Sequence, residues 1–228
     1  MEKLGTRYGG WYLPKSIDLN QDSIIYSGGV GEDMSFDLKL QSKYDSNIIL
    51  IDPTIKSVKH YEEIKQYYTI PNFSFTGNIQ HDYVKIINDL RVKFDKFHYI
   101  NKGLYCKKDT MNFYMQTNKD YVSQSLMSNM FGTEYYEVEV DTIKNIMQDL
   151  NHTKIDLLKL DIEGAEIEVL NNMLDDEIYP RYLCIEFDLL IKNKDTDKST
   201  NKVIMRLLES GYNILINDKL NITFERKI

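Results

Sequence analysis

The sequence has little of what marks a metal-binding, nucleic-acid-binding or membrane-spanning protein. Its two cysteines, Cys106 and Cys184, lie far apart, and its four histidines show no metal-ligand spacing. A net charge of -7 argues against a nucleic-acid surface, which needs clustered Lys and Arg. No apolar run is long enough to cross a bilayer. We therefore predict no metal site, no nucleic-acid partner and no membrane span; the alternative for metal is that acids at predicted strand ends hold Mg²⁺.

The start of the sequence and its cysteines favour a soluble, intracellular, cytoplasmic protein. The first 14 residues lack the continuous apolar segment of a signal peptide. Cys184 lies in an apolar run, as a buried thiol in a reducing compartment would. The length of 228 residues fits one domain over residues 23–228, preceded by an arm or lid over residues 1–22. The sequence is compatible with self-association but does not indicate it.

The stretch from Lys154 to Leu170 carries the strongest functional pattern. An apolar run over residues 155–160 predicts a strand buried on both faces, and Asp161 and Glu163 stand where it ends. Ligands collect outside the carboxyl ends of the strands in an open parallel sheet. We therefore interpret both acids as candidate catalytic residues; the alternative is that they stabilise the start of the next helix.

A glycine-rich loop follows an earlier predicted strand, and an acid follows the next one. Gly28, Gly29 and Gly31 come directly after residues 23–27 and would let the backbone approach a ligand. Asp52, before Pro53, ends the strand over residues 47–52, at the spacing at which a carboxylate holds ribose hydroxyls. The alternative for Asp52 is a helix-cap role.

The same loop argues against a dinucleotide cofactor. The third glycine of a dinucleotide fingerprint is missing, because Asp33 follows Glu32 there. Two adjacent acids would repel a pyrophosphate, whereas they suit the sulfonium and amino groups of S-adenosylmethionine. An NAD-dependent oxidoreductase is therefore the weaker hypothesis.

Further candidates lie at other predicted strand ends and in a polar loop. Asn101 and Gly103 follow a strand over residues 97–100, while the end of the strand over residues 182–187 carries Glu186 and Asp188. Glu186 and Asp188 could be catalytic or structural. Substrate contacts are expected from four further residues: Ser123 and Ser125, with hydroxyl groups in an irregular loop, and Tyr8 and Trp11, two aromatic residues in a glycine-containing segment. The alternatives are a surface loop and an aromatic arm that packs on the domain.

The sequence resembles the FkbM family of S-adenosylmethionine-dependent methyltransferases. The resemblance rests on YSGGVGEDMSFD at residues 26–37, IDPT at residues 51–54, IDLLKLDIEGAE at residues 155–166, and residues 185–187. It implies a Rossmann-like class I methyltransferase fold, an α/β architecture with a mostly parallel seven-stranded sheet and helices on both faces. It also implies methyl transfer, usually to a hydroxyl oxygen of a sugar or natural product.

The resemblance assigns roles at the matching positions. Gly29 and Gly31 would line the methionine part of the cofactor, Asp52 would hold the ribose, and Asp161 and Glu163 would lie near the transferring methyl group. Two positions depart from the family pattern: Ser27 stands where an acid is usual, and Asp188 stands where many members have a histidine.

The leading hypothesis is an O-methyltransferase acting on a sugar, a glycan or a related small molecule. Asp161 is the first candidate for the base, followed by Glu163, Glu186 and Asp188. A non-catalytic binding module on a methyltransferase scaffold is the alternative. The predicted cofactor contacts are Ser27, Gly28, Gly29, Gly31, Glu32, Asp33, Asp52, Pro53, Asn101, Gly103 and Asp161.

Overall fold

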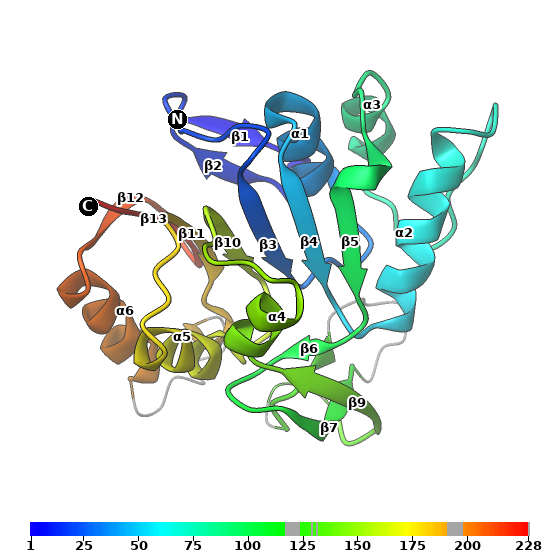
Figure 1. Ribbon diagram of the computed structural model, residues 1–228. Coiled ribbons are helices and arrows are strands. Elements are labelled where there is room, and N and C mark those ends of the chain that lie inside the picture. Colours follow the sequence, from blue (N-terminus) through cyan, green and yellow to red (C-terminus); the bar gives the residue numbers. More distant parts are fainter. Residues whose placement is uncertain (117–123, 129, 131, 191–197, 228) are drawn as a thin grey trace.

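The computed structural model describes residues 1–116, 124–128, 130, 132–190 and 198–227. Its centre is a seven-stranded sheet in the order β12-β13-β11-β10-β3-β4-β5 (Figure 1). The strands are β3 (Ile24–Gly28), β4 (Asn47–Ile51), β5 (Phe97–Ile100), β10 (Leu157–Leu160), β11 (Tyr182–Glu186), β12 (Tyr212–Asp218) and β13 (Asn221–Arg226). Strands β11, β10, β3, β4 and β5 pair in parallel, and β13 is antiparallel to both neighbours. The predicted Rossmann-like class I methyltransferase fold is confirmed.

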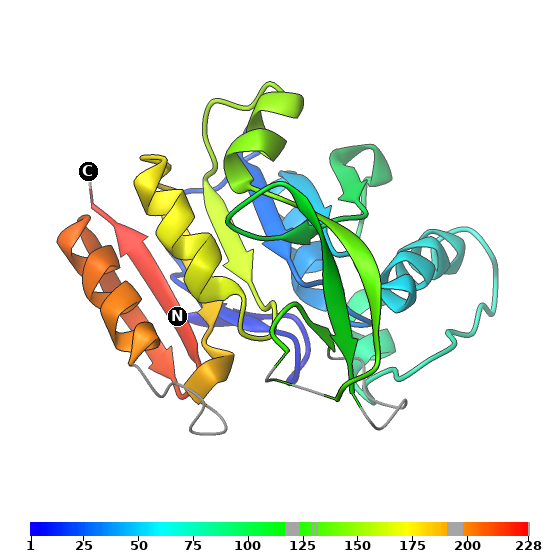
Figure 2. The same cartoon turned by 90° about the horizontal axis from the view of Figure 1, so that it is seen from below.

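Helices cover both faces of this sheet. One face carries α1 (Ser35–Tyr44), α2 (Ile55–Tyr67), the short α3 (Tyr83–Ile87) and a hairpin of β1 (Glu2–Leu4) and β2 (Trp11–Leu13). The other face carries α4 (Ile143–Asp149), α5 (Glu166–Asp175) and α6 (Ser199–Glu209). Figure 2 shows α5 and α6 lying beside each other. Two short 3₁₀ helices, η1 (Phe94–Lys96) and η2 (Asp188–Leu190), complete the main domain. None of the helices described is both long and apolar enough to cross a membrane.

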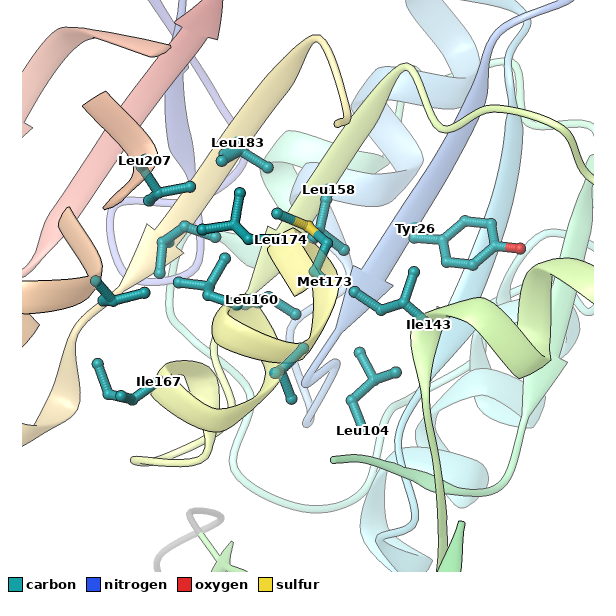
Figure 3. Close-up of a cluster of buried hydrophobic side chains, with 14 of the residues drawn as sticks. Tyr26, Leu104, Ile143, Leu158, Leu160, Ile167, Met173, Leu174, Leu183 and Leu207 are labelled. Atoms are coloured by element: carbon teal, nitrogen blue, oxygen red, sulfur yellow. The ribbon is translucent and has the colours of Figure 1, made fainter. Parts of the chain in front are cut away.

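Each central strand contributes side chains to two separate hydrophobic cores, because its side chains alternate between the two faces of the sheet. In β10, Leu158 and Leu160 pack with Leu174 of α5 and Leu207 of α6 (Figure 3). Leu157 belongs to the core on the opposite face, beneath α1 and α2. All four residues of β10 are buried. This is the burial predicted for a central parallel strand.

A second, four-stranded sheet lies beyond the carboxyl ends of β3, β4 and β5 (Figure 1). Its order is β6-β9-β7-β8, formed by β6 (Gly103–Leu104), β9 (Tyr135–Asp141), β7 (Asp109–Met115) and β8 (Gln124–Ser125). Strands β7 and β9 pair antiparallel along their length. The small sheet covers the edge of the main sheet at which the candidate site residues were predicted.

Candidate active site

A cavity of about 300 Å³ lies at the carboxyl ends of β3, β4 and β10. Its lining comes from the glycine loop (residues 29–33), the end of β4 (residues 51–54), the end and turn of β10 (Lys159 and residues 161–163) and the N-terminal turn at Tyr8 and Gly9. Further lining residues are Asn78, Gln80, Gly103, Leu104, Phe113, Gln124 and Leu126. Segments far apart in the sequence thus meet at the edge predicted to bind a ligand.

The glycine loop touches the turn after β10. Gly29 has a φ of 75°, and a Cβ built there would lie 1.7 Å from the carbonyl oxygen of Asp161. Gly31 also has a positive φ, of 60°. A side chain at Gly29 would push these two segments apart, so the glycine permits the contact. The loop backbone lies open to the cavity between them.

Asp52 holds the glycine loop in shape. Its Oδ2 accepts hydrogen bonds from the backbone N–H of Val30 at 2.7 Å and of Gly31 at 2.9 Å. Its Oδ1 accepts the N–H of Thr54 at 2.7 Å. The side chain also lines the cavity, and each carboxylate oxygen can accept more than one hydrogen bond. The bonds to the loop therefore leave acceptor capacity for the ribose predicted at this position.

The two acids of the loop, Glu32 and Asp33, are tied to neighbouring segments. Asp33 accepts the hydroxyl of Thr6 at 2.5 Å on Oδ2 and the N–H of Ser35 at 3.0 Å on Oδ1. Glu32 accepts the N–H of Asn78 at 3.3 Å. Both acids line the cavity. They therefore order two of its walls, a role that the sequence did not indicate.

A turn over residues 5–10 carries Tyr8 to the mouth of the cavity. The N–H of Thr6 donates to Ser35 Oγ at 2.8 Å, and the N–H of Gly9 donates to Thr6 Oγ1 at 2.9 Å. Tyr8 is 69% exposed and lines the cavity. Desolvation, and after it the charge of Asp161, raises the pKa of Tyr8 to about 12. Its hydroxyl therefore stays protonated at neutral pH.

Four acids gather around the turn after β10. Asp161 and Glu163 line the cavity, and Glu163 has a left-handed φ of 55°. Glu186 is the last residue of β11, which is paired directly with β10, and Asp188 lies two residues beyond it. Burial, and after it the charges of neighbouring acids, raises the pKa of Glu186 to about 8 and of Asp188 to about 10. Both therefore favour the protonated form, and neither lines the cavity, so Asp161 and Glu163 are better placed to take a proton from a ligand.

Sequence reasoning missed two residues of this region, Glu166 and Lys159. Glu166 is fully buried and accepts the N–H of Gly164 at 2.8 Å and of Asp188 at 3.1 Å, which braces the β10 turn against the end of β11. Burial raises the pKa of Glu166 to about 7. Lys159 is buried within β10 and lines the cavity. Each is a charged residue inside an apolar stretch of the sequence. A charge buried in this way needs a partner, so the sequence could have indicated that both residues contact other polar groups.

Several predicted site residues lie elsewhere. Ser27 and Gly28 are buried inside β3 and do not line the cavity, and Asn101 is exposed outside its lining. Trp11, 3% exposed, packs in the core beneath α1. Ser125 is buried, and its hydroxyl donates to the Glu163 carbonyl oxygen at 2.5 Å, so it supports the turn. Ser123 lies outside the described residues. Within the described residues, no group of three or more His, Cys, Asp or Glu could hold a metal ion.

Three solved structures are similar to this chain over most of its length. A fibrillarin–Nop5p complex is 10% identical, with 92% of this chain and 75% of that chain covered and a TM-score of 0.44. The Methanococcus jannaschii fibrillarin pre-rRNA processing protein is 12% identical, with 93% of this chain and 71% of that chain covered and a TM-score of 0.44. Aeropyrum pernix fibrillarin, in a structure with natively bound S-adenosyl-L-methionine, is 11% identical, with 90% of this chain and 66% of that chain covered and a TM-score of 0.38. The chain matches no curated protein.

The sequence itself matches a family over most of its length. Residues 47–214 match the methyltransferase FkbM domain, and this range includes Asp52, the turn after β10 and the end of β11. The glycine loop, which precedes the matched range, completes the cavity. S-adenosylmethionine is the cofactor of such a domain. The chain therefore belongs to the FkbM methyltransferase family and is an S-adenosylmethionine-dependent methyltransferase.

Proposed function

We propose that the chain is an O-methyltransferase that acts on a hydroxyl group of a sugar, a glycan or a related small molecule. One observation supports this above the others: Asp161 and Glu163 line the same cavity as Gly29, Gly31 and Asp52. The candidate base and the candidate cofactor loop therefore line the same cavity. Methyl transfer needs this arrangement, because the acceptor oxygen must come within about 3 Å of the methyl carbon.

The residues of the cavity fit S-adenosylmethionine. The backbone at Gly29 and Gly31 is open to a ligand, and a Cβ at Gly29 would fill the contact with the β10 turn. Asp52 would hold the ribose, while Glu32 and Asp33 supply negative charge for the positive groups of the cofactor. When bound, S-adenosylmethionine supplies an electrophilic methyl group on a sulfonium.

Asp161 is the proposed base. It lines the cavity, where its side chain is placed to orient an acceptor hydroxyl and take its proton, and its Oδ2 lies 3.6 Å from Lys159 Nζ. Glu163 is the second candidate. Glu186 and Asp188 do not line the cavity, and burial raises their pKa values to about 8 and about 10, so both are weaker candidates.

The acceptor is proposed to bind beneath Tyr8. Its largely exposed ring stands at the cavity mouth, where it can pack on the apolar face of a sugar. Gln124 of β8 also lines the cavity and offers an amide to hydroxyl groups. Polar and aromatic groups together favour a polyhydroxylated acceptor over a purely apolar one.

Identification of the methylated product tests this proposal. The purified protein would be incubated with methyl-labelled S-adenosylmethionine and a panel of neutral sugars, amino sugars and glycans, with NAD binding as a control for the oxidoreductase alternative. Mass spectrometry and NMR would locate the transferred methyl group. We expect an O-methyl product and no NAD binding. Methylation only on nitrogen or carbon, or cofactor binding without transfer to any acceptor, would contradict the proposal.

A further inference from the structure

Lys159 lies between two segments that the proposed chemistry must keep together. It is 5% exposed within β10, and its Nζ donates a hydrogen bond to the carbonyl oxygen of Gly29. The same Nζ lies 3.6 Å from Asp161 Oδ2. One ammonium group therefore joins the glycine loop to the proposed base.

Lys159 also determines the balance of charge in the cavity. Among the described residues that line it, Lys159 is the one basic side chain, against five acids: Glu32, Asp33, Asp52, Asp161 and Glu163. A buried ammonium is retained only where partners offset its loss of water. Its partners are the carbonyl oxygen of Gly29 and the carboxylate of Asp161, and both residues line the cavity. The charge of Lys159 therefore acts on a ligand bound in the cavity.

We infer that Lys159 is the positioning residue of the transfer site, which fastens the glycine loop to Asp161 and offsets the negative charge that a cationic cofactor meets. The inference rests on the proposed function, because it takes Asp161 to lie beside the reacting group. Its consequence concerns ligand charge. S-adenosylmethionine carries a sulfonium, whereas its demethylated product is neutral at sulfur, so a change of charge at residue 159 affects the two affinities differently.

A purely structural role for Lys159 is the alternative to be distinguished. Asp37 of α1 is 2% exposed, on the face of the sheet toward which Lys159 points. Burial raises the pKa of Asp37, and the charge of Lys159 opposes this shift. If Lys159 only compensated Asp37, its replacement would lower the stability of the fold but would not change the relative affinity for the two ligands.

The test compares the affinities for S-adenosylmethionine and S-adenosylhomocysteine by calorimetry. Lys159→Met removes both the charge and the donor, whereas Lys159→Gln removes the charge but keeps a donor for the Gly29 carbonyl. Lys144→Met is the matched control, because Lys144 forms an ion pair with Asp176 outside the cavity lining. Thermal unfolding of each variant would show whether it folds.

We expect both neutral variants to shift the affinity ratio toward S-adenosylmethionine by about threefold to tenfold, an effect of one charge at short range. Asp161→Asn should shift the ratio the opposite way, and Lys144→Met should leave it unchanged. An unchanged ratio in folded Lys159→Met and Lys159→Gln would overturn the inference, as would the failure of both to fold. If the wild type binds neither ligand, the proposed function fails instead.

Discussion

Replacement of Gly29 by alanine tests the contact between the glycine loop and the β10 turn. The φ of 75° costs alanine about 1 kcal/mol, as does any left-handed position. In addition, the new Cβ would lie 1.7 Å from the Asp161 carbonyl oxygen, a backbone atom that cannot swing aside as a side chain does. The two segments would have to separate by more than 1 Å, and overpacking of this kind costs about 1–3 kcal/mol more.

Gly211→Ala supplies the matched control. Gly211 has a φ of 92°, so alanine meets a similar backbone cost, but the nearest atom to its Cβ would be 3.8 Å away. By urea unfolding, we expect Gly29→Ala to lose about 2–4 kcal/mol and Gly211→Ala about 1 kcal/mol. Gly29→Ala should also weaken S-adenosylhomocysteine binding by at least about tenfold, because the loop moves away from Asp161. Equal losses of stability, with unchanged binding, would refute this reasoning.

Three further predictions concern residues around the cavity. The raised pKa of Asp188, about 10, means that the folded protein retains a proton which the unfolded chain loses above about pH 4. The free energy of unfolding of the wild type therefore falls as pH rises between these values, whereas residue 188 no longer titrates in Asp188→Asn. Between pH 6 and pH 9, the free energy of unfolding of Asp188→Asn, measured with urea, should rise relative to that of the wild type by up to about 4 kcal/mol. A difference between the two proteins that does not depend on pH would refute this. Thr6→Val removes the hydroxyl that donates to Asp33 and accepts the N–H of Gly9, so it should cost about 1–3 kcal/mol of unfolding free energy and weaken S-adenosylhomocysteine binding, because both partners line the cavity; unchanged affinity measured by calorimetry would contradict it. Glu166→Ala leaves the buried N–H groups of Gly164 and Asp188 without their acceptor and should lower the free energy of unfolding by about 2–5 kcal/mol in the same assay. An unchanged free energy of unfolding would contradict this.

The fold was predictable because its central elements are specified locally. Residues 155–160 and 182–187 are apolar runs of strand length, and each is followed by acids and then by a new element. Apolar runs of this length are typical of strands buried on both faces, and their alternation with helical patterns favours a parallel sheet. The predicted fold is therefore correct, although the four-stranded sheet that covers the site was not predicted.

The site was predictable only where it depends on strand ends. Asp161 and Asp52 could be placed by position, since parallel strands end at one edge. Contacts between distant segments could not be predicted: Lys159 reaches Gly29 across 130 residues of sequence. The aromatic pattern that suggested Trp11 as a substrate contact is equally typical of a packed arm, and the structure places its side chain in the core.

The most direct test of the central claim is methyl transfer by Asp161→Asn. The rate of O-methylation of the acceptor found in the screen would be measured for wild type and variant, together with S-adenosylhomocysteine affinity. We predict a loss in kcat of about 10²-fold or more with affinity within about threefold of wild type, because the base is lost while the cofactor loop remains. Unchanged turnover in Asp161→Asn with cofactor binding intact would contradict the account.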